Sequence, residues 1–158
     1  MSRRKVKPSE RLQELGISLP AIPPAAGRYL PGVRSGQLVF VSGQTPTVNG
    51  QPVITGYVGK DVSLDQARQA ARLAALNCLA QLHAVTGSLD RVRRIVRLTG
   101  YVRSATGFGD QPSVINGASE LLIDLWGELG QHARSAIGVA ELPGGAPVEI
   151  ELVAEVEP

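Results

Sequence analysis

Residues 132–156 read HARSAIGVAELPGGAPVEIELVAEV, and this stretch decides the fold because two runs suited to β-strands flank the turn-forming segment ELPGGAP. The first run places Arg134 among small and apolar residues. The second run alternates apolar residues with Glu149, Glu151 and Glu155. Two strands joined by a short glycine-rich turn are expected to pair antiparallel. The sequence therefore raises the question of what an arginine and a row of carboxylates do on one sheet.

Two long helices are predicted upstream of this stretch. The segment SLDQ, which begins at Ser63, matches a capping box in which the serine hydroxyl accepts from the amide of Gln66. A helix from this point is expected to end at Gly87, and a second helix, over residues 113–129, is expected to end at Gly130. The buried stripe of the first comprises Leu64, Ala67, Ala71, Ala74, Cys78, Leu82 and Val85. That of the second comprises Val114, Ala118, Leu121, Leu122, Leu125 and Leu129.

Three further strands are predicted. Residues 27–33 and 37–43 form two of them, joined by a turn at Arg34-Ser35-Gly36, and residues 45–52, TPTVNGQP, form a loop. The third strand covers residues 91–102. Its two-residue alternation places Val92, Val96, Leu98 and Val102 on one face. The other face carries Arg93, Ile95, Arg97, Thr99 and Tyr101.

The chain is divided into an N-terminal arm, residues 1–26, and a domain, residues 27–158. In the arm, SERLQEL predicts a short helix ended by Gly16, and the Pro-rich segment LPAIPPAAG connects it to the domain. The element order of the domain is β-β-α-β-α-β-β, which predicts an α+β fold in two layers with both helices on one face of the sheet. The other face mixes Ile95 and Val153 with charges, a composition that suits a subunit interface.

The composition indicates a single cytoplasmic domain that depends on packing. Of 158 residues, 43% are hydrophobic and 19% charged, and no apolar run approaches the ~20 residues of a membrane span. The basic start MSRRKVKPSE is not followed by the apolar segment of a signal peptide. Cys78 has no disulfide partner in the chain, and no Cys/His cluster has metal-site spacing. A net charge of +2 and only 4% aromatic residues disfavour nucleic acid as a partner.

Two common catalytic motifs are absent. Gly59-Lys60 lacks both the first glycine and the Ser/Thr of a P-loop, and Ser42 lacks the flanking glycines of a nucleophile elbow. His83 and His132 have no evident Ser or Cys partner along the chain. The sequence thus gives no support for a conventional hydrolase.

Three segments together resemble the Rid family, the reactive intermediate deaminases formerly called YjgF-like proteins or L-PSP endoribonucleases. They are GRYLPGVRSGQLVFVSGQTP at residues 27–46, INGASELL at residues 115–122, and the stretch at residues 132–156. The resemblance implies a chorismate-mutase-like fold with a mixed β-sheet, a homotrimer with ligand clefts between subunits, and no cofactor. The implied activity is the hydrolysis of enamines and imines, such as 2-aminoacrylate, to a 2-keto acid and ammonia.

The resemblance also implies which residues perform this chemistry. Arg134 is the arginine expected to grip the substrate carboxylate, for which a planar guanidinium offers two parallel donors. Glu149 is the carboxylate expected near a bound water, where it would orient the water and transfer protons. The remaining positions of the implied substrate site are Tyr29, Ser42, Gly43 and Asn116. A different interpretation stays open for Arg134, namely a structural pair with a glutamate across the strands.

Four departures from the family pattern bear on the substrate. Arg28 replaces a proline before Tyr29, Ala136 replaces the cysteine of many relatives, the loop between Phe108 and Asn116 is longer, and the arm is additional. The preferred imino acid is therefore not fixed. Two alternatives remain open: a trimer that binds small carboxylates without turnover, and an RNA-binding protein, endoribonuclease or translation inhibitor.

Overall fold

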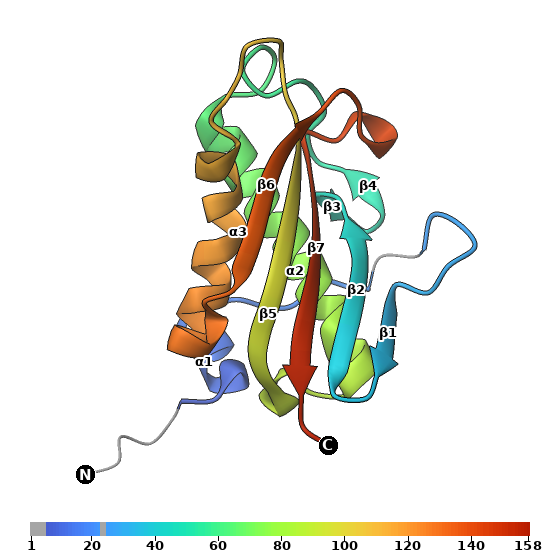
Figure 1. Ribbon diagram of the computed structural model, residues 1–158, viewed down its shortest axis with the longest axis vertical. Helices are drawn as coiled ribbons and strands as arrows, with labels where there is room; N and C mark the ends of the chain where they lie inside the picture. Colours follow the sequence, from blue (N-terminus) through green and yellow to red (C-terminus); the bar gives the residue numbers. More distant parts are fainter. Residues whose placement is uncertain (1–5, 23–24) are drawn as a thin grey trace.

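The computed structural model describes residues 6–22 and 25–158 and shows a five-stranded mixed sheet covered on one face by two long helices (Figure 1). The strand order is β1-β2-β7-β5-β6. The strands are β1 (Gly32–Ser35), β2 (Leu38–Gln44), β5 (Val92–Arg103), β6 (Ala133–Val139) and β7 (Val148–Val156), and the helices are α2 (Leu64–Thr86) and α3 (Gln111–Trp126). This architecture confirms the predicted two-layer α+β fold.

Helix α2 begins and ends where the sequence predicts. The Ser63 hydroxyl accepts from the amide of Gln66 at 3.2 Å, and the Gln66 side chain accepts from the Ser63 amide at 3.0 Å. Gly87 ends the helix in the left-handed region, with φ of 81°. Helices α2 and α3 approach closely at Gly117, where an added Cβ would lie 2.1 Å from the backbone oxygen of Arg68. Only glycine fits at this crossing.

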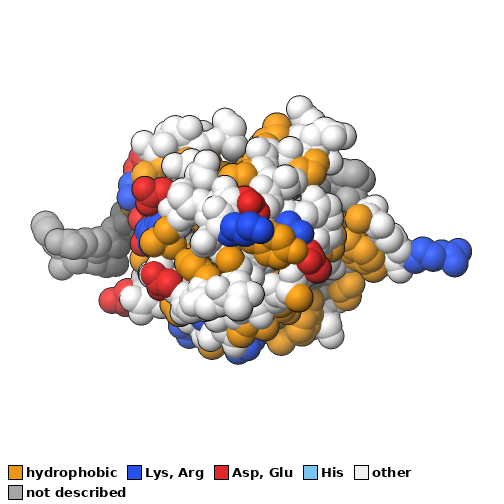
Figure 2. Space-filling view, turned by 90° about the horizontal axis from the view of Figure 1, so that it is seen from above, with side chains coloured by type: hydrophobic (Ala, Val, Ile, Leu, Met, Phe, Trp, Pro, Cys, Tyr) orange, Lys and Arg blue, Asp and Glu red, His pale blue; other side chains and the backbone are white. Residues whose placement is uncertain are grey.

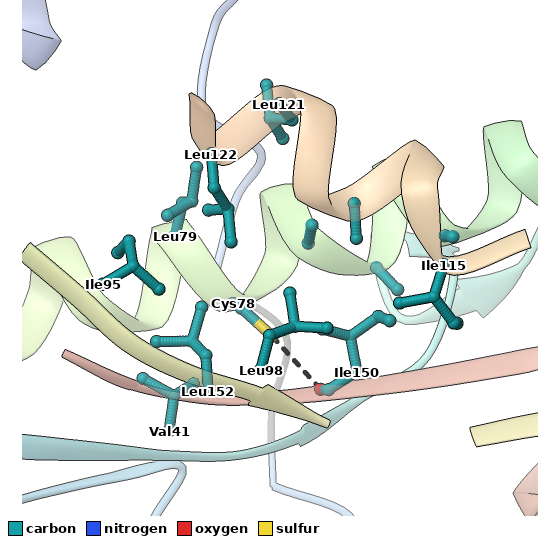
Figure 3. Packing of buried hydrophobic residues seen from close by; sticks show 14 of the residues in the cluster. Val41, Cys78, Leu79, Ile95, Leu98, Ile115, Leu121, Leu122, Ile150 and Leu152 are labelled. Carbon is teal, nitrogen blue, oxygen red and sulfur yellow. Dashed lines mark hydrogen bonds between the residues drawn. The ribbon is translucent and has the colours of Figure 1, made fainter. Parts of the chain in front are cut away.

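The core lies between the helices and the sheet (Figure 3). Cys78 of α2 is fully buried there and its Sγ donates to the carbonyl of Ile150 in β7 at 3.2 Å. Burial raises the pKa of this thiol. The prediction that Cys78 is a core residue is confirmed. Leu64, which was assigned to the same stripe, is instead 37% exposed.

The last two strands do not pair with each other, so the predicted antiparallel pair is wrong. Strand β5 lies between them, parallel to β6 and antiparallel to β7. The parallel pair is formed by the crossover through α3, while β7 inserts between β2 and β5. The connection between β6 and β7 contains the short helix η3 (Pro143–Gly145) and crosses the sheet at the end of β5 (Figure 1).

The predicted assignment of side chains to the two faces of β5 is wrong at Ile95 and Val96. Irregularities in its pairing with β7 lie between Val92 and Arg94 and between Ile95 and Arg97. Each bulge shifts the two-residue alternation by one position. Ile95 is therefore fully buried on the helix side and Val96 is 36% exposed, the reverse of the prediction. The contribution of Ile95 to a subunit interface falls away, whereas Val153 does lie beside the glutamates of β7 on the partly exposed face.

Two local predictions near the N-terminal side of the domain are corrected as well. The first strand begins at Gly32 rather than at residue 27, and its turn lies at Gly36-Gln37. The segment predicted as a loop contains a small hairpin, β3 (Thr47–Val48) with β4 (Gln51–Pro52). Its turn residues, Asn49 and Gly50, have φ of 51° and 76°. Positive φ at both positions is the requirement of a type I′ turn, which Asn-Gly satisfies.

The arm packs on the domain through helix α1 (Pro8–Glu14). Leu12 is 8% exposed and belongs to the core cluster. Ser9 donates its amide and its hydroxyl to the carboxylate of Asp90, in the 3-10 helix η1 (Leu89–Arg91). Arg11 donates to the carbonyl of Asp124 at 3.0 Å. No helix within residues 6–22 and 25–158 is long and apolar enough to cross a membrane.

Candidate functional site

Arg134 lies on the edge strand β6 and points toward helix α3. In the parallel register it is the partner of Leu98, which is buried on the helix side of the sheet. Its Nη1 donates to the side-chain oxygen of Asn116 at 2.7 Å and to the Ser119 hydroxyl at 3.2 Å. Its Nη2 donates to the carbonyl of Pro112 at 3.4 Å. The first turns of α3 therefore hold the guanidinium in place, and Arg134 and Asn116 are brought together as predicted.

The acceptors around Arg134 are all neutral. Among the described residues, no carboxylate lies within 4.0 Å of the guanidinium, so the alternative of a glutamate pair across the strands does not apply. Its Nε has no hydrogen-bond acceptor among residues 6–22 and 25–158. Burying an unpaired cation, even partly, costs free energy, and binding of an anion reduces that cost. The Nε side of the guanidinium therefore offers charge-assisted donors to a ligand anion.

A second group of predicted residues gathers around β2 and β7. Gly43 packs directly against Glu149, because a Cβ at residue 43 would lie 2.4 Å from the Glu149 carboxylate. The Ser42 hydroxyl donates to the carbonyl of Leu30 at 2.7 Å, and its amide donates to the carbonyl of Pro31 at 2.9 Å. Ser42 thus anchors the loop that carries Tyr29. The Tyr29 hydroxyl accepts from the amide of Ala26 at 3.3 Å, and its side chain is 48% exposed.

Electrostatics distinguish Glu149 from an ordinary surface carboxylate. Partial burial, and then the neighbouring charge of Glu151, raise its pKa. Glu151 itself accepts from the Tyr101 hydroxyl at 2.7 Å, and this bond raises the pKa of Tyr101 to about 12. Tyr101 is the register partner of Glu149 on β5. Glu149 thus lies on the open face next to a second carboxylate and a tyrosine.

The same face of the sheet is hollowed. A depression of about 320 Å³ is lined by Val33, Phe40, Val41, Ser42, Arg97, Thr99, Glu151, Leu152 and Val153. Arg97, which lines it from β5, donates to the Ser135 hydroxyl of β6 at 2.9 Å. Phe40 is 47% exposed and Val33 47% exposed. This face thus combines exposed apolar side chains with polar groups, as the sequence predicts.

Within one chain, the residues around Arg134 and those around Glu149 do not lie on the same side of the sheet. Leu98 and Tyr101 are three residues apart on a regular part of β5, so they point to opposite faces of the sheet. Their respective register partners are Arg134 and Glu149. Arg134 therefore faces the helix layer at the β6 edge, while Glu149, with Ser42 and Gly43, faces the open side.

The structure also reveals a pair that the sequence analysis missed. The Ser119 hydroxyl lies 2.9 Å from Nε2 of His132, and Nδ1 of His132 lies 2.6 Å from the carbonyl of Gly130. His132, which has no evident Ser or Cys partner in the sequence, therefore does have a serine partner in the structure. The two are thirteen positions apart in sequence, on different elements, so no local pattern indicated the pair.

Two of the departures from the family pattern can be placed on helix α3 and strand β6. Gln111, Pro112 and Ser113, expected in a longer loop, form the first turn of α3. Ala136 packs against the core. No group of three or more His, Cys, Asp or Glu side chains that could hold a metal ion occurs among the residues described.

A further cluster lies where β5 and β6 end. The Tyr57 hydroxyl donates to Glu141, whose carboxylate also accepts from Nε of Arg103 at 2.8 Å. The Arg103 guanidinium lies 3.8 Å from the centre of the Tyr57 ring. Figure 2 looks onto this end and shows basic and acidic side chains next to each other among uncharged ones. The charges of this cluster compensate each other.

Comparison with known proteins agrees with this fold. Residues 9–156 match a family model described as "YjgF/chorismate mutase-like, putative endoribonuclease". Protein TCP17 of Trypanosoma cruzi is 43% identical over 145 residues, 91% of each chain. A 2-iminobutanoate/2-iminopropanoate deaminase of Salmonella typhimurium is 33% identical, over 84% of this chain and 90% of the relative. The crystal structure of Atu1372 from Agrobacterium tumefaciens, of unknown function, is 45% identical with a TM-score of 0.87, over 96% of this chain and 94% of that one. The chain belongs to the YjgF-like, or Rid, family.

Proposed function

We propose that the protein hydrolyses small enamine or imine intermediates that carry a carboxylate, such as 2-aminoacrylate, to a 2-keto acid and ammonia. The observation that carries this proposal is the uncompensated guanidinium of Arg134, held by Asn116, Ser119 and Pro112. Neutral acceptors fix its orientation without neutralising its charge. Such a group is suited to orienting a ligand carboxylate.

Glu149 is the proposed proton-transfer group. An enamine becomes an imine when its terminal carbon gains a proton. Hydrolysis then requires that water add to the imine carbon, that the nitrogen gain protons, and that the C–N bond break to release ammonia. A carboxylate with a raised pKa exchanges protons closer to neutral pH than an ordinary one. Gly43 allows the Glu149 carboxylate to pack against β2, because any side chain at residue 43 would displace it. Because imine hydrolysis is intrinsically easy, orientation supplies most of the rate in this mechanism.

The site is completed by a second chain in this proposal. Arg134 and Glu149 face opposite sides of one sheet, so a cleft that contains both needs Arg134 from one subunit and Glu149, with Ser42, Gly43 and Tyr29, from its neighbour. The hollowed face with Phe40 and Val153 is the proposed contact surface. Light scattering at low micromolar concentration should report three times 16.6 kDa. A stable monomer would contradict the two-chain cleft.

The carboxylate role of Arg134 is tested by calorimetry with pyruvate on wild type, Arg134→Lys and Arg134→Ala. Lysine keeps the charge but loses the parallel donors, so we expect binding to weaken about tenfold or more for Arg134→Lys and further for Arg134→Ala. Arg11→Lys, on helix α1, is the matched control and should bind as wild type does. Equal affinity of wild type and a trimeric Arg134→Lys variant would contradict the proposal.

Turnover and RNA binding separate the alternatives. Release of ammonia from 2-aminoacrylate generated in situ, measured against the spontaneous rate, distinguishes an enzyme from a protein that only binds carboxylates. The family description names an endoribonuclease. An RNA titration over a range of salt concentrations tests that activity, because phosphate contacts weaken steeply as salt rises. Tight, salt-dependent binding together with absent deamination would favour the nucleic-acid alternative.

A further inference from the structure

Ser119 connects Arg134 to His132 through a chain of hydrogen bonds. The Ser119 hydroxyl oxygen accepts from Nη1 of Arg134 at 3.2 Å and lies 2.9 Å from Nε2 of His132. Nδ1 of His132 lies 2.6 Å from the carbonyl of Gly130. Ser119 is 8% exposed, so its hydroxyl depends on these partners for its hydrogen bonds.

The carbonyl of Gly130 fixes the direction of this chain. A carbonyl only accepts, so Nδ1 of neutral His132 carries the hydrogen and Nε2 accepts from Ser119. When Nε2 gains a proton, it must donate to the Ser119 oxygen instead, and Ser119 then accepts from both neighbours. A hydroxyl can serve both states because it donates and accepts. Ser119 therefore joins two cationic positions without fixing His132 in one protonation state.

The surroundings of His132 favour its neutral form in the free protein. Burial, and to a lesser extent the charge of Arg134, lower the pKa of His132, while its bond to Gly130 acts in the opposite direction. Arg94 of β5 and His132 line the same surface hollow, which is about 430 Å³ in volume. On α3, Glu120 pairs with Arg68. Glu128, in the 3-10 helix η2 (Gly127–Gly130), is exposed.

We propose that His132 and Ser119 are a proton-coupled part of the anion site, such that His132 takes up one proton from solvent when a carboxylate binds at Arg134. An anion cancels the charge of the guanidinium, so a second positive charge one hydroxyl away no longer meets net repulsion. By reciprocity, the protonated form of His132 binds the carboxylate more tightly. This inference rests on the proposed carboxylate site, and it adds the partners that set the pH range of that site.

The test follows His132 directly by NMR of protein labelled with ¹⁵N-histidine. The chain has two histidines, and the exposed His83 on α2 is the internal reference. We expect free neutral His132 to carry its hydrogen on Nδ1. Saturating pyruvate should raise the pKa of His132 and leave the signals of His83 unchanged. Calorimetry should show roughly tenfold tighter pyruvate binding below the titration of His132 than above it, the change expected for charges separated by one side chain.

Matched variants distinguish coupling between His132 protonation and pyruvate binding from a structural role of His132 and from an effect of Glu149. His132→Gln keeps a polar side chain but does not titrate, so the pH dependence of pyruvate affinity should largely disappear. Glu149→Gln removes the contribution of the Glu149 carboxylate, and the part of the pH dependence that is due to His132 should remain. If His132 had only a structural role, His132→Gln would lower pyruvate affinity equally at all pH values.

Two results would overturn the inference alone: the Nε2–H tautomer in the free protein, or pyruvate binding that leaves the His132 titration unchanged. Absence of pyruvate binding at every pH would overturn the proposed function together with the inference.

Discussion

The two sides of the sheet differ in how completely one chain finishes them. On the helix side, residues such as Ile95, Leu98 and Ile150 are fully buried under α2 and α3. On the open side, Phe40 and Val33 are about half exposed beside Glu149 and Glu151. Buried apolar packing stabilises a chain on its own, whereas a mixed face gains from a partner surface. Packing on the helix side thus stabilises the fold, whereas the open side carries the glutamate that the proposed chemistry requires.

Arg134 is the exception to this division. It points to the helix side, yet its cation has no carboxylate partner among the described residues. Because β6 is an edge strand of the sheet, the proposed cleft can place Arg134 beside a neighbouring chain. The contrast between the sides therefore predicts that substitutions on the helix side change stability, whereas substitutions at Arg134 and on the open side change binding and turnover.

The largest expected effect is on the helix side, at Gly117. A Cβ there would lie 2.1 Å from the backbone oxygen of Arg68, so Gly117→Ala must force α2 and α3 apart. We expect the free energy of unfolding to fall by more than about 3 kcal/mol. Gly109→Ala is the control, since a Cβ at residue 109 meets no atom within 4 Å. Urea denaturation with equal stability for both variants would show that the helices can adjust.

A smaller loss of stability is expected for the arm. Leu12 is 8% exposed within the core cluster, so Leu12→Ala should lower the free energy of unfolding by about 2 kcal/mol. The arm is thus expected to add stability, although residues 27–158 contain the sheet and both long helices. Leu15→Ala, at a 37% exposed position, should change little. An unchanged melting temperature for Leu12→Ala would show that α1 is only loosely held.

The smallest expected effect is on the open side and has the opposite sign. The raised pKa of Glu149 means that ionising it opposes folding, so Glu149→Gln should slightly increase the free energy of unfolding at neutral pH. Solvent screening limits this gain to about 0.5 kcal/mol. The gain should vanish in acid, where Glu149 is protonated in both states. Exposed Glu128→Gln is the control, and a large loss of stability for Glu149→Gln would identify a structural carboxylate.

The elements of the fold could be predicted wherever the signal is local. Ser63 with Gln66 marks the start of α2, and Gly87 its end, because caps act within one turn. The order of strands could not be predicted, since β7 inserts between β2 and β5 from the far end of the chain. The exchange of Ile95 and Val96 depends on bulges that only the partner strand reveals.

The candidate site divides in the same way. Family motifs indicated Arg134 and Asn116, and the structure joins them at 2.7 Å. The Ser119–His132 pair depends on the close approach of α3 to the start of β6, a tertiary contact that no local pattern encodes.

The most direct test of the account is complementation between inactive subunits. Arg134→Ala and Glu149→Gln should each have little deaminase activity alone. In mixed trimers made by co-expression, a cleft with Arg134 from one chain and Glu149 from another is intact, so random assembly should restore about a quarter of wild-type activity. A chain with both substitutions, co-expressed with either single variant, should restore none. Failure of the two single variants to complement within verified mixed trimers would contradict the two-chain cleft.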